Sequence, residues 1–241
     1  MSLPGTPSDD VEGVLATGDG EVTTLFVSMA RRHPDGTDAE YLRWHTLDHR
    51  PEQHRLSAVR ASLRLVSTPA CRDARAAGHG RYDEIDHVMT YFFTAPSGMD
   101  GFLELSRALG DAGRKLPLLP PVERGVYDVR ARAAAARVKV GADVLPWWPV
   151  TGVYLLLKKG HAPTDRLLAI DGVAGTWTAT ALDVDAKLGN APAGQSLTYC
   201  FLDDDPVAVA GRLHPVVQDR NLLLAAPFHT VVPHDWGRYV P

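Results

Sequence analysis

Apolar and polar positions along the chain alternate in patterns that predict short strands followed by amphipathic helices. The clearest pair of strands is residues 89–93 (MTYFF) and 197–201 (LTYCF), which share the order apolar, Thr, Tyr, apolar, Phe. Each run is followed after four residues by a helix-capping candidate, Ser97 or Asp205, and then by apolar residues at helical spacing. Both stretches therefore predict the same unit of strand, turn and helix, and they indicate an internal repeat.

The repeat extends on both sides of these units. The first half adds a helix that contains the WHTLDH sequence, and the second half adds a short helix near residues 164–170. The predicted strands are residues 23–31, 60–68, 89–93 and 123–131 in the first half and 153–159, 176–184, 197–201 and a segment within 222–232 in the second. Each half is therefore β-α-β-β-α-β, the ferredoxin-like arrangement.

The MTYFF and LTYCF strands are apolar on both faces, whereas a single ferredoxin-like sheet has helices on one face only. The bare face of each sheet must therefore be covered by the other sheet. The predicted fold class is α+β, with two tandem ferredoxin-like repeats packed sheet to sheet as an intramolecular α+β barrel.

This interpretation divides the chain into four parts. They are a flexible N-terminus at 1–20, a first repeat at 21–130, a linker at 131–149 and a second repeat at 150–241. The linker contains Trp147 and Trp148, and we expect both rings to pack over a seam, because large aromatic side chains tend to be buried.

Composition and charge narrow the functional classes. The net charge is −4 and the arginines are scattered among acids, so nucleic acid is not an expected partner. No segment approaches the ~18 apolar residues of a membrane helix. Cys71 and Cys200 form no close-spaced motif, which suits a reducing compartment, and we expect a cytoplasmic protein. The sequence has no P-loop, dinucleotide fingerprint or nucleophile elbow, which argues against nucleotide-dependent chemistry and common hydrolases.

One motif of about 25 residues resembles a known family. Trp44 is followed by His49, Arg50 and Pro51, and the stretch at residues 56–65 (LSAVRASLRL) resembles a Pro-Gly-Val-Arg strand entry without its Pro-Gly. The chain is similar in these features to EthD-type proteins of the dimeric α+β barrel superfamily. Family members are often single-repeat homodimers, so the resemblance implies a fused version, and a homodimer of the fused chain is left open.

The resemblance implies small-molecule chemistry but not one reaction. The wider superfamily includes cofactor-free monooxygenation, polyketide cyclisation, lactone isomerisation and haem chemistry, and a fold alone does not choose among them. The second half lacks the Trp and the His-x-Pro sequence, so at most one site of the family type is expected per chain.

The helix with the WHTLDH sequence carries the candidate chemistry. At 100° per residue, one face holds Tyr41, Trp44, His45 and Asp48, with His49 on its flank and Arg43, Thr46 and Arg50 opposite. An ordinary core helix would present Leu, Ile or Val there, and burying imidazole or carboxylate without partners costs roughly 1–3 kcal/mol each. This face therefore predicts the wall of a pocket.

Three hypotheses compete for the histidines. In the first, His49 or His45 is a general acid or base, held in one tautomer by a neighbour such as Asp48. In the second, the two histidines bind a metal through their i,i+4 spacing, although the sequence shows no third ligand. In the third, the helix is structural, with Tyr41, Trp44 and Leu47 facing the sheet and the histidines half-exposed at a helix end.

His87 and Tyr91 alternate on one face of the predicted strand IDHVMTYFF. If that face looks toward the first helix, both join His49 in one pocket. If it looks toward the other sheet, they are core residues with hydrogen-bonded polar ends. The sequence leaves these two orientations open.

The preferred hypothesis is a protein that binds a small hydrophobic molecule, aromatic or polyketide-like, and performs cofactor-free cyclase, isomerase, lyase or monooxygenase chemistry. The proposed catalytic residues are His49, His87 and Tyr91, and the proposed substrate-binding residues are Tyr41, Trp44, His45 and Asp48. No metal or cofactor is expected. The alternatives are a non-catalytic ligand-binding or structural barrel and a haem protein with His214 or His229 as the axial ligand.

Overall fold

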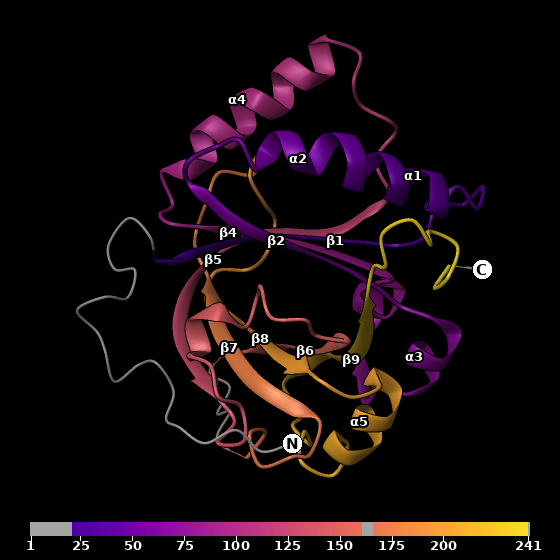
Figure 1. Cartoon of the computed structure of the whole chain (residues 1–241), viewed down its shortest axis with the longest axis vertical. Coiled ribbons are helices and arrows are strands. Elements are labelled where there is room, and N and C mark those ends of the chain that lie inside the picture. Colours follow the sequence, from indigo (N-terminus) through magenta and orange to yellow (C-terminus); the bar gives the residue numbers. More distant parts are fainter. Residues whose placement is uncertain (1–20, 161–165, 241) are drawn as a thin grey trace.

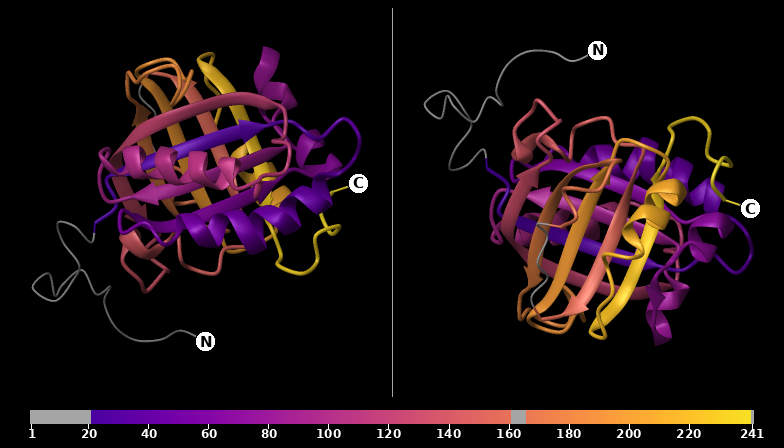
Figure 2. Two further views of the ribbon diagram at one scale, coloured as in Figure 1. Left: turned by 90° about the horizontal axis from the view of Figure 1, so that it is seen from above. Right: turned by 90° about the horizontal axis from the view of Figure 1, so that it is seen from below.

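The computed structural model describes residues 21–160 and 166–240. Eight of its strands close into an antiparallel barrel in the order β2-β4-β1-β5-β7-β8-β6-β9, and pairing of β9 with β2 completes the ring (Figures 1 and 2). These strands are β1 (Thr24–Ala30), β2 (Val59–Val66), β4 (His87–Phe93), β5 (Pro121–Ala134), β6 (Gly152–Lys159), β7 (Val173–Ala181), β8 (Gln195–Leu202) and β9 (Leu222–Thr230). The predicted α+β barrel is confirmed, and its closure leaves no strand edge open within the ring.

The two halves of the ring have the same strand order. In β2-β4-β1-β5 and in β7-β8-β6-β9, the sequence is second strand, third strand, first strand, fourth strand. The short strand β3 (Ala77–Gly78) pairs with β9 outside the ring. The halves differ in their helices: residues 166–169 form turns and residue 170 a bend, so the short helix predicted near 164–170 is wrong for these described positions.

Helices cover the outer face of the first half of the barrel. They are α1 (Asp38–Trp44), a π-helical turn (His45–His49), α2 (Arg50–Gln53) and α4 (Gly98–Asp111), and Figure 1 shows them above β1, β2 and β4. The second half is covered by α5 (Pro206–Leu213), while α3 (Pro69–Asp73) lies near it. Asp205 caps α5 as predicted, because its carboxylate accepts the N–H groups of Val207 and Ala208 at 3.1 and 2.9 Å. The side chain of Ser97, at the start of α4, makes no such bond.

Side chains fill the inside of the barrel. Along β4, Val88 and Phe92 face the interior, where Phe92 packs edge-on against Trp177 of β7. The alternate residues of β4, including Met89 and Tyr91, belong to a separate cluster under the helices. An eight-stranded barrel has an interior just wide enough for side chains to fill. A ligand cavity is therefore expected between sheet and helices, where the alternation of β4 directs Tyr91.

The junction between the halves is partly strand. β5 continues to Ala134, and its last residues pair with β7, so the first four residues of the stretch predicted as a linker lie in the barrel wall. Trp148 packs against the barrel core as expected, whereas the side chain of Trp147 is 47% exposed. The predicted flexible N-terminus, 1–20, lies outside the described residues. Within 21–160 and 166–240, no helix has the length and hydropathy needed to cross a membrane.

Candidate functional site

The helical segment that carries the histidines contains a widened turn. The backbone N–H of Arg50 donates to the carbonyl of His45, five residues earlier, so His45–His49 is a π-turn between α1 and α2. Such turns are rare and occur frequently at functional sites. The extra residue changes which side chains face the sheet: Thr46, placed on the outer face by the helical projection, is buried.

The burial pattern of this turn opposes the structural hypothesis. That hypothesis places Leu47 against the sheet and leaves the histidines half-exposed. Instead Leu47 is 49% exposed, whereas His45 and His49 are only 4% and 9% exposed. The chain therefore buries imidazoles where an ordinary core helix would bury leucine.

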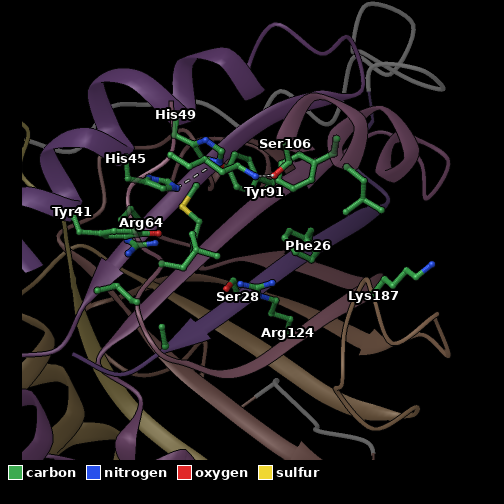
Figure 3. Close-up of a pocket in the computed structure, with 17 residues that line it drawn as sticks. Phe26, Ser28, Tyr41, His45, His49, Arg64, Tyr91, Ser106, Arg124 and Lys187 are labelled. Atoms are coloured by element: carbon green, nitrogen blue, oxygen red, sulfur yellow. Dashed lines mark hydrogen bonds between the residues drawn. The ribbon is translucent and has the colours of Figure 1, made fainter. Parts of the chain in front are cut away.

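A cavity of about 140 Å³ lies between this segment, α4 and the outer face of β1, β2 and β4. Figure 3 shows Tyr41, His45 and His49 entering it from the helical segment and Phe26 and Tyr91 from the sheet. A closed apolar cavity of about 150 Å³ is large enough for one benzene ring. Aromatic rings therefore form part of a wall that also contains aliphatic and charged side chains, and the volume is close to that needed for a single ring.

Imidazole and phenol groups meet on one side of the cavity. The hydroxyl of Tyr91 lies 3.4 Å from Nε2 of His45, and the Trp44 ring stacks on His49 with ring centroids 5.1 Å apart. Tyr41 stacks on His45, with ring centroids 5.8 Å apart. Within the described residues, Nδ1 of His45 and Nδ1 of His49 have no hydrogen-bond partner. Two oriented imidazoles therefore retain free ring nitrogens.

Burial sets the protonation state of these groups. It lowers the pKa of His45 well below the ordinary value, and the charge of Arg64 adds to this effect. It also lowers the pKa of His49 from 6.5 to about 4, aided by Lys115 and opposed by Asp48. Burial raises the pKa of Tyr91. At neutral pH, both imidazoles are therefore uncharged and able to accept a proton, and the phenol keeps its proton.

His87 lies on the face of β4 that looks toward the helices, which resolves the orientation left open by the sequence. Its Nε2 contacts Oδ1 of Asp38, at the start of α1, at 2.6 Å, and both side chains are buried. Asp38 also accepts the backbone N–H of His33. Burial lowers the pKa of His87, whereas hydrogen bonding to His87 lowers the pKa of Asp38 against the opposing effect of burial. His87 thus anchors α1 to the sheet and is absent from the cavity wall.

Trp44 and Asp48 are not among the residues that line the cavity, and both contact Arg114. The indole Nε1 of Trp44 donates to the carbonyl of Arg114 at 3.1 Å, and the Asp48 carboxylate forms an ion pair with the Arg114 guanidinium at 3.1 Å. Both contacts tie the loop after α4 to the helical segment. The structure therefore brings together Tyr41, His45, His49 and Tyr91, and it places Trp44, Asp48 and His87 around them.

Several wall residues were not predicted from the sequence, and the most informative of them is Arg64. Arg64 of β2 lines the cavity and is 5% exposed, with its guanidinium 5.1 Å from the Tyr41 ring centroid. The sequence did contain a signal, because Arg64 stands between Leu63 and Leu65 in an otherwise apolar part of its strand. A charged residue at a strand position that faces a helix-covered side is expensive to bury, so it indicates a functional site.

The metal and haem hypotheses receive little support from the residues present. The rings of His45 and His49 are 5.5 Å apart between centroids, but within the described chain no third His, Cys, Asp or Glu completes a metal-binding group with them. His214 is exposed at the end of α5, and His229 stacks on Tyr239 at 4.3 Å. Neither arrangement fits an axial haem ligand, which faces an apolar cavity.

Comparisons with known proteins find similarity at the level of structure. No family model matches the sequence, and no curated protein matches it. A chlorite dismutase from Candidatus Nitrospira defluvii is similar with a TM-score of 0.47 and 11% identity, covering 93% of this chain and 95% of that one. A chlorite dismutase-like protein has a TM-score of 0.46, 11% identity and coverage of 90% and 97%. An anthrone oxidase-like protein has a TM-score of 0.44, 9% identity and coverage of 90% and 94%.

The buried neutral histidines predict a pH-dependent stability. Below their ordinary pKa of 6.5, the unfolded chain binds protons at His45, His49 and His87 that the folded chain does not bind. Because the unfolded state binds more protons than the folded state, the free energy of unfolding falls as the pH drops from 6.5 toward about 4. Melting temperatures measured across this window should decrease, and the decrease should be smaller in H49Q. An identical pH dependence in H49Q would contradict the assignment to His49.

Proposed function

We propose that this chain is an EthD-like α+β barrel protein, built from two ferredoxin-like repeats, that binds a small aromatic molecule and transfers protons with His49 and His45 without a cofactor. The observation that carries the proposal is the burial of two imidazoles with unpartnered ring nitrogens in the wall of a cavity that Phe26, Tyr41, Tyr91 and Phe102 also line. Burying such groups without a use costs roughly 1–3 kcal/mol each. A ligand that exchanges protons with these nitrogens would be the partner that they lack.

The protonation states leave both imidazoles as neutral proton acceptors at neutral pH. His49, with its pKa lowered to about 4, is a neutral acceptor whose ring lines the cavity. Tyr91 keeps its proton and can donate to a ligand oxygen or to His45. Tyr41 and Phe26 hold an aromatic ring by stacking and exclude water from it. These roles describe cyclase, isomerase or lyase chemistry that begins with a proton transfer.

Deuterium exchange provides a test with a simple probe. Acetophenone combines one aromatic ring with a carbonyl whose methyl protons exchange only after removal by a base. We expect the protein in D₂O near pD 7 to accelerate deuterium incorporation into this methyl group above the buffer rate, as measured by proton NMR. Heat-unfolded protein at the same concentration serves as the control for free histidine.

The outcomes separate the proposal from its alternatives. Acceleration by folded protein supports a proton-transfer site. Acetophenone that binds, by saturation-transfer NMR, but exchanges only at the buffer rate would indicate a ligand-binding protein instead. Failure of acetophenone to bind at all would contradict the aromatic-ligand assignment.

A further inference from the structure

Arg64 is a buried cation without a counter-charge. It is 5% exposed, and its Nε and one terminal nitrogen have no hydrogen-bond partner among the described residues. None of the ion pairs within 21–160 and 166–240 includes it, although its strand neighbour Arg60 is exposed to solvent. A guanidinium in this state is strongly unfavourable, because burial removes its hydration and no carboxylate among the described residues pairs with it.

The surroundings of Arg64 supply no anion. Tyr41 covers its guanidinium from α1, His45 approaches from the π-turn, and His87 and Tyr91 approach from β4. The nearby Arg50 of α2 is itself a cation. At neutral pH the imidazoles of His45 and His87 are uncharged and the phenol of Tyr91 keeps its proton, so none of the three carries a negative charge. The aromatic contact with Tyr41 compensates only part of the desolvation of the cation.

The remainder of the cavity is also positive. Three more cations line it, Lys115, Arg124 and Lys187, and its described wall contains no Asp or Glu. Figure 3 shows Arg64 beside Tyr41 on one side of the cavity and Arg124 and Lys187 on the side away from the histidines. The two carboxylates of the helical segment contact other residues: Asp38 forms a hydrogen bond with His87, and Asp48 forms an ion pair with Arg114. The missing charge must therefore come from the ligand.

We propose that the cavity recognises a monocyclic aromatic carboxylate, with Arg64 as the residue that binds the carboxylate group. The planar fork of a guanidinium matches the two oxygens of a carboxylate, and burial strengthens this charged hydrogen bonding. The aromatic wall and the volume of about 140 Å³ accommodate one ring. This assignment deepens the proposed function by naming the substrate class of the same site.

Calorimetric titration with benzoate and its neutral analogue benzamide tests the assignment. We expect the full chain to bind benzoate at least about tenfold more tightly than benzamide, because only benzoate satisfies the buried charge. R64M should reduce benzoate affinity by about tenfold or more and leave benzamide affinity nearly unchanged. R64K, which keeps the charge but lacks the fork, should fall between them. R60M, on the same strand but exposed, is the matched control and should bind as the parent does.

A second readout guards against a variant that fails to fold. R64M without ligand should melt no lower than the parent, because methionine has a similar length and removes an uncompensated buried charge. A large decrease in melting temperature would show that Arg64 serves the fold and would overturn the assignment. Equal binding of benzoate and benzamide, or full benzoate binding by R64M, would also overturn it while leaving an aromatic site intact. Binding of neither compound would contradict both this assignment and the proposed function.

Discussion

H49Q is expected to slow deuterium exchange into acetophenone by about 100- to 10,000-fold relative to the parent protein, which is the usual contribution of a positioned acid or base. Glutamine is polar and of similar reach, but it cannot accept a proton at neutral pH. H49Q should therefore lower the exchange rate at saturating acetophenone and leave the binding of acetophenone largely intact. Proton NMR of the methyl signal measures the first quantity, and saturation-transfer NMR measures the second.

H54Q is the matched control for this prediction. His54 follows the same helical segment, is exposed, and contacts the Ser62 hydroxyl at 2.7 Å, away from the cavity wall. Its exchange rate should equal that of the parent. An unchanged rate in H49Q would show that His49 is not the base, and loss of exchange in H45Q alone would then assign proton transfer to His45.

E123A is expected to lower the free energy of unfolding by about 3–5 kcal/mol, because it removes a buried carboxylate and leaves the buried donors of Tyr82 and Gln195 without that acceptor. Glu123 of β5 is 1% exposed, and its carboxylate accepts from Arg81 at 2.6 Å, Tyr82 at 2.8 Å and Gln195 at 2.6 Å. The hydroxyl of Tyr127 lies at 3.4 Å. These donors come from both halves of the barrel, so their loss weakens the closure of the ring.

Thermal and denaturant unfolding check this prediction, with a decrease in melting temperature of about 2–4 °C per kcal/mol for a chain of this size. E123Q keeps part of the hydrogen bonding and should lose less stability than E123A. E84A is the surface control: Glu84 pairs with Arg31, both side chains are more than half exposed, and its loss should cost less than about 1 kcal/mol. Equal effects of E84A and E123A would show that the buried network does not support the fold.

The strands of the barrel were predictable because their signal is local. Residues 89–93 and 197–201 are apolar on both faces, and every residue of β4 and β8 is buried. The absence of a helix at residues 166–170 was not predictable in this way. The apolar residues there suggested a helix, yet of Leu167, Leu168 and Ile170 only Leu167 is buried. Short helices depend on packing of an apolar face, and here little surface is available to pack.

The π-turn also lay beyond the sequence pattern. A helical projection assumes 3.6 residues per turn, which placed Thr46 on the outer face, whereas Thr46 is buried. Nothing in WHTLDH itself requires the wider turn. The turn depends on packing of His45 and His49 against the sheet, which involves residues far away in the chain.

The sequence by itself determined the strands of the α+β barrel, the helices that follow residues 97 and 205, and the histidine-bearing segment as the candidate site. These features follow from apolar periodicity and residue chemistry over short stretches of chain. Only the tertiary structure decided that His87 bonds to Asp38 outside the cavity and that Arg64 is buried in its wall without a counter-charge. The physical reason is that burial and charge pairing depend on contacts between distant elements, and those contacts exist only after the barrel has closed and the helices have packed on it.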